Sequence, residues 1–234
     1  MSTEGRAIRL LFVGGSTDSL KSKAIDHLAR RLTRGLREDD TDEVSLRVSR
    51  YLAEQVGKRR GRELGDPSEL QGLIDSLPLY EWKDSESDAV DGIIATIIRA
   101  PGPVGLRILN CHFASYSPSD YMMGLEVSSL EKICDKVYRD APRDEGVLVG
   151  VILVDRSIDA ILEQKREEMQ ASSYSVPAVL DDLRYNRLYS LIYYSVLSGL
   201  LGPQCVKYRR IVNRDSDHCA RDVLECIRDD WGMV

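Results

Sequence analysis

The sequence predicts one α/β domain in which a parallel sheet is covered by helices on both faces, a three-layer arrangement. Strand-like runs alternate with helical patterns along the chain, an order that produces parallel strands joined by crossover helices. Residues 146–154 (GVLVGVILV) form a nearly continuous apolar run, as expected of a central parallel strand buried on both faces. The chain has 234 residues, of which 43% are hydrophobic and 30% charged, and this composition suits a folded globular domain.

Apolar spacing places the remaining elements along the chain. Strands are recognised as short β-branched runs, and helices as apolar residues three or four positions apart. The expected strands are residues 9–13, 105–112, 146–154 and 205–212. The expected helices are residues 21–36, 88–99, 127–138, 157–170, 180–197 and 219–231.

The stretch from about residue 37 to residue 87 has little periodicity. Residues 44–56 fit either a second strand or the start of a helix, and residues 57–76 are basic and contain glycine. A short helix is expected after Asp66-Pro67, a pair that favours a helix start. The sequence therefore predicts a single domain, 1–234, with an irregular insertion at about 37–87.

Charge and cysteine usage limit the classes of partner and compartment. The net charge of −6 argues against a broad nucleic-acid-binding face, and only Lys58–Arg62 (KRRGR) is basic enough to contact nucleic acid. A solvated helix end is the simpler interpretation of that cluster. The five cysteines are widely spaced, without a metal-ligand pattern, which indicates reduced buried thiols. Because no run reaches the roughly 20 apolar residues of a membrane span, we expect a cytoplasmic protein.

One stretch, LLFVGGSTDSLKSKAIDHLARRL (residues 10–32), has the order of parts of a phosphate-binding loop. In such a loop backbone N–H groups surround the phosphates, a lysine reaches the outer phosphates and the next hydroxyl binds Mg²⁺. The lysine is Lys21 and the hydroxyl belongs to Ser22. The candidate nucleotide-binding residues of this stretch are Gly14, Gly15, Ser16, Thr17, Ser19, Lys21 and Ser22.

Leu20 departs from this pattern, because it stands where the motif has a glycine. A left-handed backbone at a non-glycine residue costs about 1–2 kcal/mol, and the leucine side chain could fill space meant for phosphate. Chance placement of Lys21 at a helix start is the simpler alternative.

The chain resembles the archaeal-type adenylate kinases, a branch of the P-loop nucleoside monophosphate kinases. Four segments besides the loop carry the resemblance: ILNCHFASYSPSDYMMGL (Ile108–Leu125), GVILVDRSIDAILEQK (Gly150–Lys165), YNRLYSLIYYSVLSGL (Tyr185–Leu200) and VKYRRIVNRDSDHCARDVLECI (Val206–Ile227). Together they cover roughly 60% of the chain, and residues from about 37 to 100 align poorly. The resemblance implies a P-loop kinase-like three-layer fold, ATP and Mg²⁺ as cofactors, and transfer of a phosphoryl group from ATP to AMP.

The resemblance also implies roles for three residues outside the loop. Asn110 stands at the family's aspartate, where with Ser22 it would hold the metal through water. His112 matches the family histidine beside the nucleotide. Arg187 matches the family's Asn-Arg pair and, with Lys21, is the candidate catalytic cation. The simpler alternatives are a rim histidine at His112, and pairing of Arg187 with the nearby Asp181 or Asp182 on its own helix.

Several cations of the family are missing. The lid run has no arginine at residues 170–173, and the AMP-side segment at 75–81 is acidic and apolar. Each lost cation of this kind is worth on the order of 10²–10³ in rate. We therefore expect a divergent, adenylate-kinase-like protein, a pseudoenzyme that binds a nucleotide or another phosphate ligand and transfers phosphate weakly or not at all.

Two other functions stay open from the sequence. The first is an active ATP:AMP phosphotransferase in which Arg59 or Arg62 replaces the lost arginines. The second is a scaffold that uses the fold without nucleotide, docking through the basic cluster or the helix with Tyr189, Tyr193 and Tyr194. That tyrosine group indicates core packing or an oligomer contact. A homo-oligomer is an expectation from the resemblance alone.

Overall fold

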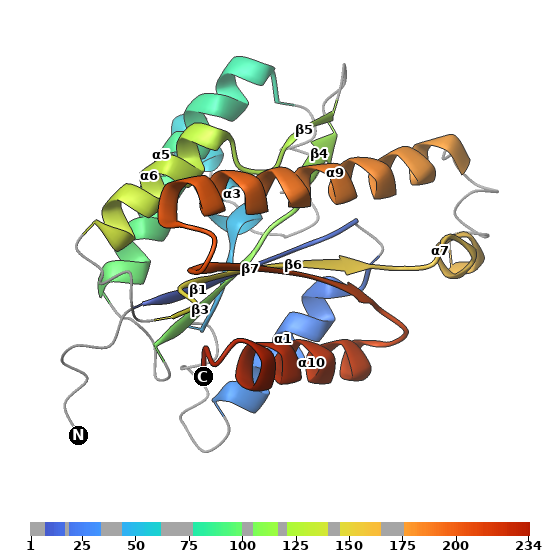
Figure 1. Cartoon of the computed structure of the whole chain (residues 1–234). Coiled ribbons are helices and arrows are strands. Elements are labelled where there is room, and N and C mark those ends of the chain that lie inside the picture. The colour runs from blue at the N-terminus through green and yellow to red at the C-terminus, as the bar shows by residue number, and fades with distance from the viewer. Residues whose placement is uncertain are drawn as a thin grey trace.

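The protein has a five-stranded parallel sheet at its centre (Figure 1). The computed structural model describes residues 8–16, 19–33, 44–61, 77–99, 105–116, 121–139, 146–164 and 176–234. The strands are β1 (Arg9–Gly14), β2 (Ser45–Arg47), β3 (Leu106–Asn110), β6 (Val149–Asp155) and β7 (Val206–Val212), in the spatial order β2-β3-β1-β6-β7. All neighbouring pairs are parallel.

Helices cover both faces of this sheet, which confirms the predicted fold class. On one face lie α1 (Lys21–Leu32) and α10 (Ser216–Glu225), the latter continued by the short helix η1 (Cys226–Asp230). On the other lie α5 (Leu79–Arg99), α6 (Val127–Tyr138) and α9 (Val176–Leu201), with α3 (Val48–Arg59) packed on α5. Figure 1 shows α9 crossing above the sheet and the α1–α10 pair below it.

The core is divided between the two faces of the sheet. β1 and β6 are central and buried along almost their whole length, whereas β7 at the edge alternates between buried and exposed residues. Tyr193 of α9 is fully buried, with its ring against Phe12 of β1 and Phe113. Its hydroxyl accepts a hydrogen bond from the Leu125 backbone N–H. The strand ends that carry the site are thus fixed from both layers.

Helix α5 begins nine residues earlier than expected, at Leu79 instead of residue 88. Two polar residues, Ser85 and Glu86, lie on its buried face between Trp82 and Ala89, and they hide the apolar periodicity. Glu86 accepts hydrogen bonds from the Glu126 backbone N–H at 2.8 Å and the Ser129 hydroxyl at 2.7 Å. These bonds are what allow a carboxyl group to be buried there.

Other elements differ from the expectation in smaller ways. Residues 44–56 contain both of the elements considered for them, strand β2 followed by α3. The described residues between 37 and 87 therefore form β2, α3 and the start of α5, whereas the helix expected after Asp66-Pro67 lies outside the described residues. A two-stranded hairpin, β4 (Ala114–Tyr116) with β5 (Tyr121–Met123), was not predicted.

Helix ends also differ. Helix α9 starts at Val176 and ends at Leu201, so it is longer than expected at both ends. Helix α10 starts at Ser216, where Asp215 accepts backbone hydrogen bonds from Asp217 and His218. The described part of the expected helix at 157–170 is α7 (Ile158–Gln164). Among the described helices, none combines the length and apolarity that crossing a bilayer requires.

Candidate functional site

The turn between β1 and α1 keeps the shape of a glycine turn although it contains a leucine. Leu20 has φ 55° and ψ 20°, and it is the one non-glycine residue with positive φ in the described part of the chain. This left-handed conformation costs a leucine about 1–2 kcal/mol. The Ser19 backbone N–H and hydroxyl both donate to the Ser16 carbonyl, at 3.1 and 2.7 Å, which stabilises the turn. Thr17 lies outside the described residues.

Gly14 and Gly15 are required by packing. A Cβ atom on Gly15 would lie 2.1 Å from the Val154 carbonyl oxygen, and one on Gly14 would lie 2.6 Å from the Phe113 ring. The turn therefore lies directly on the end of β6 and cannot accommodate larger residues at these two positions. Their presence is explained without a ligand.

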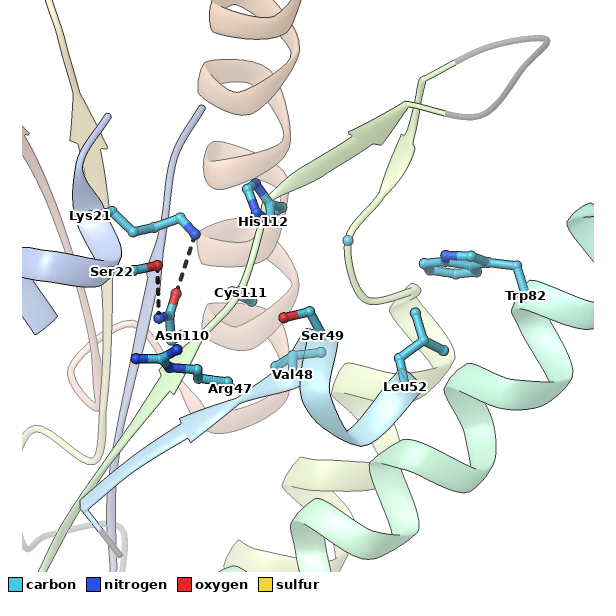
Figure 2. Close-up of a pocket in the computed structure, with 11 residues that line it drawn as sticks. Lys21, Ser22, Arg47, Val48, Ser49, Leu52, Trp82, Asn110, Cys111 and His112 are labelled. Atoms are coloured by element: carbon cyan, nitrogen blue, oxygen red, sulfur yellow. Dashed lines mark hydrogen bonds between the residues drawn. The ribbon is translucent and has the colours of Figure 1, made fainter. Parts of the chain in front are cut away.

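Lys21 is the first residue of α1, and its ammonium group points into the protein (Figure 2). The side chain is only 5% exposed. Nζ donates to Asn110 Oδ1 at 3.2 Å, and Asn110 Nδ2 donates to Ser22 Oγ at 3.3 Å. No described carboxylate lies within the 4.0 Å of an ion pair with this amine. The residue has the burial of a core side chain, but its hydrogen-bond partner is a neutral amide.

Burial is the main reason why the pKa of Lys21 falls from 10.5 to about 8. The Arg47 charge lowers it further, and the nearby Cys111 and Asp182 act in the opposite direction. A buried cation normally has an anion beside it or loses its proton. With a pKa of about 8, Lys21 changes between its protonated and neutral forms close to neutral pH.

His112 follows the end of β3 and lies beside Lys21. Its pKa falls to about 3, first because of the Lys21 charge and second because of burial, while a hydrogen bond to the Gly15 backbone raises it. The imidazole is therefore neutral at pH 7 and senses the charge on Lys21.

Arg187 is paired with a carboxylate on another element, not with one on its own helix. Its Nε donates to Asp155 Oδ2 at 2.8 Å, so its partner is neither Asp181 nor Asp182. Arg210 of β7 donates through Nε to the same oxygen at 2.8 Å. Asp155 is 2% exposed, whereas both arginine side chains are roughly half-exposed. A single buried carboxylate thus holds two arginines at the end of β6.

Asn213 connects this cluster to the turn, a contact that the sequence did not predict. Its backbone N–H donates to the Asp155 carbonyl at 2.7 Å, and its side-chain amide donates to the Ser19 carbonyl at 2.5 Å. Two features of the sequence could have indicated this contact: Asp155 at the end of an apolar run, and the turn Asn213-Arg214-Asp215. Strand ends of one parallel sheet meet at one edge, and this would have brought Asp155 and Asn213 together.

Two buried polar atoms on either side of Ser19 have no hydrogen-bond partner in the ranges that the structure describes, Ser16 Oγ and Asn213 Oδ1. Both residues are about 3% exposed. Since buried polar groups are nearly always hydrogen-bonded to protein, water or ligand, these atoms are positioned to receive a donor from outside the chain.

A pocket of about 200 Å³ opens beside Lys21. It is lined by Lys21, Ser22, Arg47, Val48, Ser49, Leu52, Trp82, Asn110, Cys111, His112 and Gly124. The described residues of this lining include two cations and no carboxylate. Arg47 is oriented by Asp26, whose two oxygens accept from Nη2 at 3.0 and 3.1 Å. Figure 2 shows the polar groups at one side of the pocket and Trp82 and Leu52 at the other.

The side chains present do not form a magnesium site by themselves. Asn110 Oδ1 accepts from Lys21, and Asn110 Nδ2 points at the Ser22 hydroxyl, so the pair offers few free oxygens. No cluster of three or more His, Cys, Asp or Glu side chains suited to a metal occurs among the described residues. Magnesium sites of this kind use one or two carboxylates together with phosphate oxygens.

The remaining sequence candidates are paired elsewhere or lie outside the described ranges. Arg59 bonds to Asp88 at 2.6 Å and Arg60 to Glu81 at 2.7 Å, both on α5. These two arginines therefore serve helix packing. Arg62 and the lid segment 170–173 are outside the described residues.

Comparisons with known proteins give only a distant likeness. No protein-family model and no curated protein matches the sequence. Among solved structures the chain is similar to a candidate kinase from Chloroflexus aurantiacus, with 13% identity, coverage of 96% of this chain and 98% of that one, and a TM-score of 0.48. It is also similar to a shikimate kinase from Acinetobacter baumannii in complex with shikimate, with 8% identity, 95% and 94% coverage and a TM-score of 0.43. A sugar kinase from Janibacter sp. has 13% identity, 97% and 98% coverage and a TM-score of 0.38. These likenesses concern the course of the chain and carry no argument about activity.

Proposed function

We propose that the chain binds the phosphates of a nucleotide at the turn before α1, and that its phosphoryl transfer is weak or lost. Lys21 is the observation that carries this proposal. Its ammonium group is buried and bonded to a neutral amide, and a buried charge without an anion is unfavourable. A phosphate oxygen beside Nζ would supply that anion.

The surroundings of the turn support an anionic ligand there. The N-terminus of the 12-residue helix α1 directs its first N–H groups toward the turn, and such ends favour anions. The left-handed Leu20 keeps the chain curved around the same point at an energetic cost. Ser16 Oγ, a buried hydroxyl beside the turn without a partner among the described residues, can donate a hydrogen bond to such an anion, whereas Asn213 Oδ1 can only accept and does not contribute to binding it.

Weak transfer follows from the number of cations available. Phosphoryl transfer depends on several charges positioned around the phosphates. Arg187 is bonded to Asp155, and among the residues that the structure describes only Lys21 and Arg47 line the pocket with a positive charge. Binding of phosphate by Lys21 does not depend on Mg²⁺. We propose that any Mg²⁺ ion is bound together with the nucleotide phosphates.

The test is the change in melting temperature with ATP, ADP, AMP and GTP, each with and without Mg²⁺. A ligand at 100 times its dissociation constant adds about 2.7 kcal/mol to the free energy of unfolding, which gives a visible shift. Lys21→Ala should abolish the shift, whereas Lys23→Ala, an exposed lysine on the same helix, should retain it. The shift should also weaken above pH 8, where Lys21 loses its proton.

Each result favours one of the functions left open by the sequence. A shift that depends on Lys21, without ADP formation from ATP plus AMP, is the expected outcome. Lys21-dependent ADP formation would instead indicate an active adenylate kinase. No shift with any nucleotide, or a shift that Lys21→Ala leaves unchanged, would contradict the proposal and favour a scaffold.

A further inference from the structure

We infer that the pocket beside Lys21 binds a second, small ligand: an organic anion with a flat apolar body, smaller than a nucleotide. The inference rests on the proposed function for the position of the nucleotide phosphates, which would meet Lys21 and Ser22. It concerns the part of the pocket that a phosphate group leaves unexplained.

The polar side of the pocket has more positive charge than one lysine provides. Arg47 lies close enough to Lys21 to lower its pKa, and none of the described residues that line the pocket is a carboxylate. Asp26 binds Arg47 through Nη2 alone, and a guanidinium has five N–H donors. Arg47 is therefore oriented by Asp26 while other donors remain available to an anion such as a carboxylate or a phosphate monoester.

The opposite side of the pocket is apolar and aromatic. Val48 and Leu52 of α3 and Trp82 of α5 form this wall, and all three are buried. Figure 2 shows Trp82 on the far side of the pocket from Lys21, with Ser49 between them. Phosphate has no apolar surface to bury against this wall. A ring or a short hydrocarbon body, in contrast, gains free energy when its apolar surface is removed from water.

The pocket is small compared with the usual sites of drug-sized ligands. Drug-sized ligands occupy sites of about 300–1,000 Å³, and this pocket has about 200 Å³. One ring with one charged group suits a pocket of this size better than a base, a ribose and a phosphate together.

Two contacts hold backbone segments around the pocket in place. A Cβ on Gly124 would lie 1.6 Å from the His112 carbonyl oxygen, which means that these two backbone segments are in direct contact. Glu86 lies one helical turn after Trp82 and accepts from the Glu126 N–H, two residues after Gly124. Helix α5 and the loop before α6 are thereby tied together around the pocket.

The test uses Trp82 as a reporter, because the chain has only two tryptophans. In Trp231→Phe the fluorescence comes from Trp82 alone. Benzoate and phenyl phosphate are the probes for a carboxylate and a phosphate monoester, benzyl alcohol is the uncharged analogue, and AMP is the oversized one. We expect a saturable fluorescence change with at least one of the two small anions, and at least tenfold weaker binding of benzyl alcohol and AMP.

Matched variants locate the binding. Arg47→Ala should weaken binding of the small anion at least tenfold, whereas Arg50→Ala should leave it within twofold, because Arg50 is exposed and pairs with Glu54. If Trp231→Phe fails to fold, ligand-observed NMR on the unmodified protein replaces the fluorescence measurement. Tighter benzoate than phenyl phosphate identifies a carboxylate ligand, and the reverse order a phosphate monoester.

Three outcomes would overturn the inference: no saturable binding of either anion, equal binding of benzyl alcohol, or binding of AMP as tight as that of the small anions. The proposed nucleotide site is assayed separately by the ATP-induced melting shift. An ATP shift without small-anion binding contradicts only this inference, and small-anion binding without an ATP shift contradicts only the proposed function.

Discussion

Lys21 and His112 are two neighbouring groups whose protonation is linked. The positive charge of Lys21 is the largest cause of the low pKa of His112, about 3. Lys21→Met should therefore move the pKa of His112 upward, toward the ordinary 6.5, because burial then lowers it alone and the hydrogen bond with the Gly15 backbone still raises it. An NMR titration of the three histidines measures this directly, and His27 and His218 serve as internal references.

The comparison variant for that titration is Lys23→Met, which removes an exposed charge from the same helix. It should leave His112 unchanged. If the pKa of His112 stays near 3 in Lys21→Met, burial and not the lysine charge controls the imidazole, and Lys21 is not a charged group in the native protein.

Leu20 offers a second test at the scale of one residue. Replacing it with glycine removes the cost of a left-handed leucine, about 1–2 kcal/mol, but adds about 0.5–1 kcal/mol of freedom to the unfolded chain. We expect Leu20→Gly to stabilise the protein by up to about 1 kcal/mol in urea unfolding. Leu20→Ala keeps the strained conformation and should bring no gain. A clear loss of stability in Leu20→Gly would show that the leucine side chain contributes more by packing than its backbone costs.

At the scale of elements, the contact between α5 and α6 depends on a buried carboxyl group. Burial raises the pKa of Glu86 to about 7 from 4.5, and the bonds from Ser129 and Glu126 act in the opposite direction. The folded protein therefore binds a proton here between about pH 4.5 and 7 when the unfolded chain does not. Stability from this group is highest below pH 4.5 and is lost as the pH rises through 7, by up to about 1.4 kcal/mol per pH unit.

Glu86→Gln should remove that dependence. A glutamine oxygen can accept the same two hydrogen bonds without a charge, so the variant should match the wild type near pH 5 and be more stable at pH 8 by about 1–3 kcal/mol. Urea unfolding at both pH values measures the difference. Glu81→Gln on the same helix is the control: Arg60 lowers the pKa of Glu81, so this variant should gain nothing at pH 8. Equal stability of Glu86→Gln and wild type at pH 8 would contradict the raised pKa.

The same elements show what could and could not be predicted from the sequence. The central strands could be predicted, because strands buried on both faces leave continuous apolar runs such as residues 149–154. The start of α5 could not, since the buried Glu86 looks like a surface residue until its partners on α6 are known. The hairpin β4–β5 could not either, because its strands have only three residues each.

At the scale of the whole molecule, the candidate site joins segments that are far apart in the sequence. Lys21 could be found from the loop pattern and Asn110 from the resemblance, but Arg47 and Trp82 join the same pocket only through the strand order and the packing of α3 on α5. Arg187 was singled out as a candidate catalytic cation, and its partner Asp155 lies on another element. Which charged residues form a pair depends on the tertiary structure, so a sequence motif does not predict the partner.

The reactivity of the five cysteines shows whether the two helical layers and the sheet unfold together. All are buried, and burial raises the pKa of Cys111, Cys134 and Cys219 to about 12 and that of Cys226 to about 11. Thiols react as thiolates, so at pH 8 a disulfide reagent such as DTNB should modify none of them rapidly in the native protein and all five in urea.

The rates at which the thiols are modified under native conditions distinguish cooperative unfolding from local opening. Cys134 and Cys205 lie in the core on the α9 side of the sheet and Cys219 in the core on the α1 side. If both layers unfold in one cooperative transition, these three thiols should be modified at a single rate, measured by mass spectrometry of the digested protein. Cys111 differs because it lines the pocket, so a small reagent can approach it without unfolding, and a pocket ligand such as benzoate should slow its modification alone. Faster reaction of Cys219 than of Cys134 would show that the α1–α10 layer opens independently, and protection of all four thiols by benzoate would assign the effect to global stability instead of the pocket.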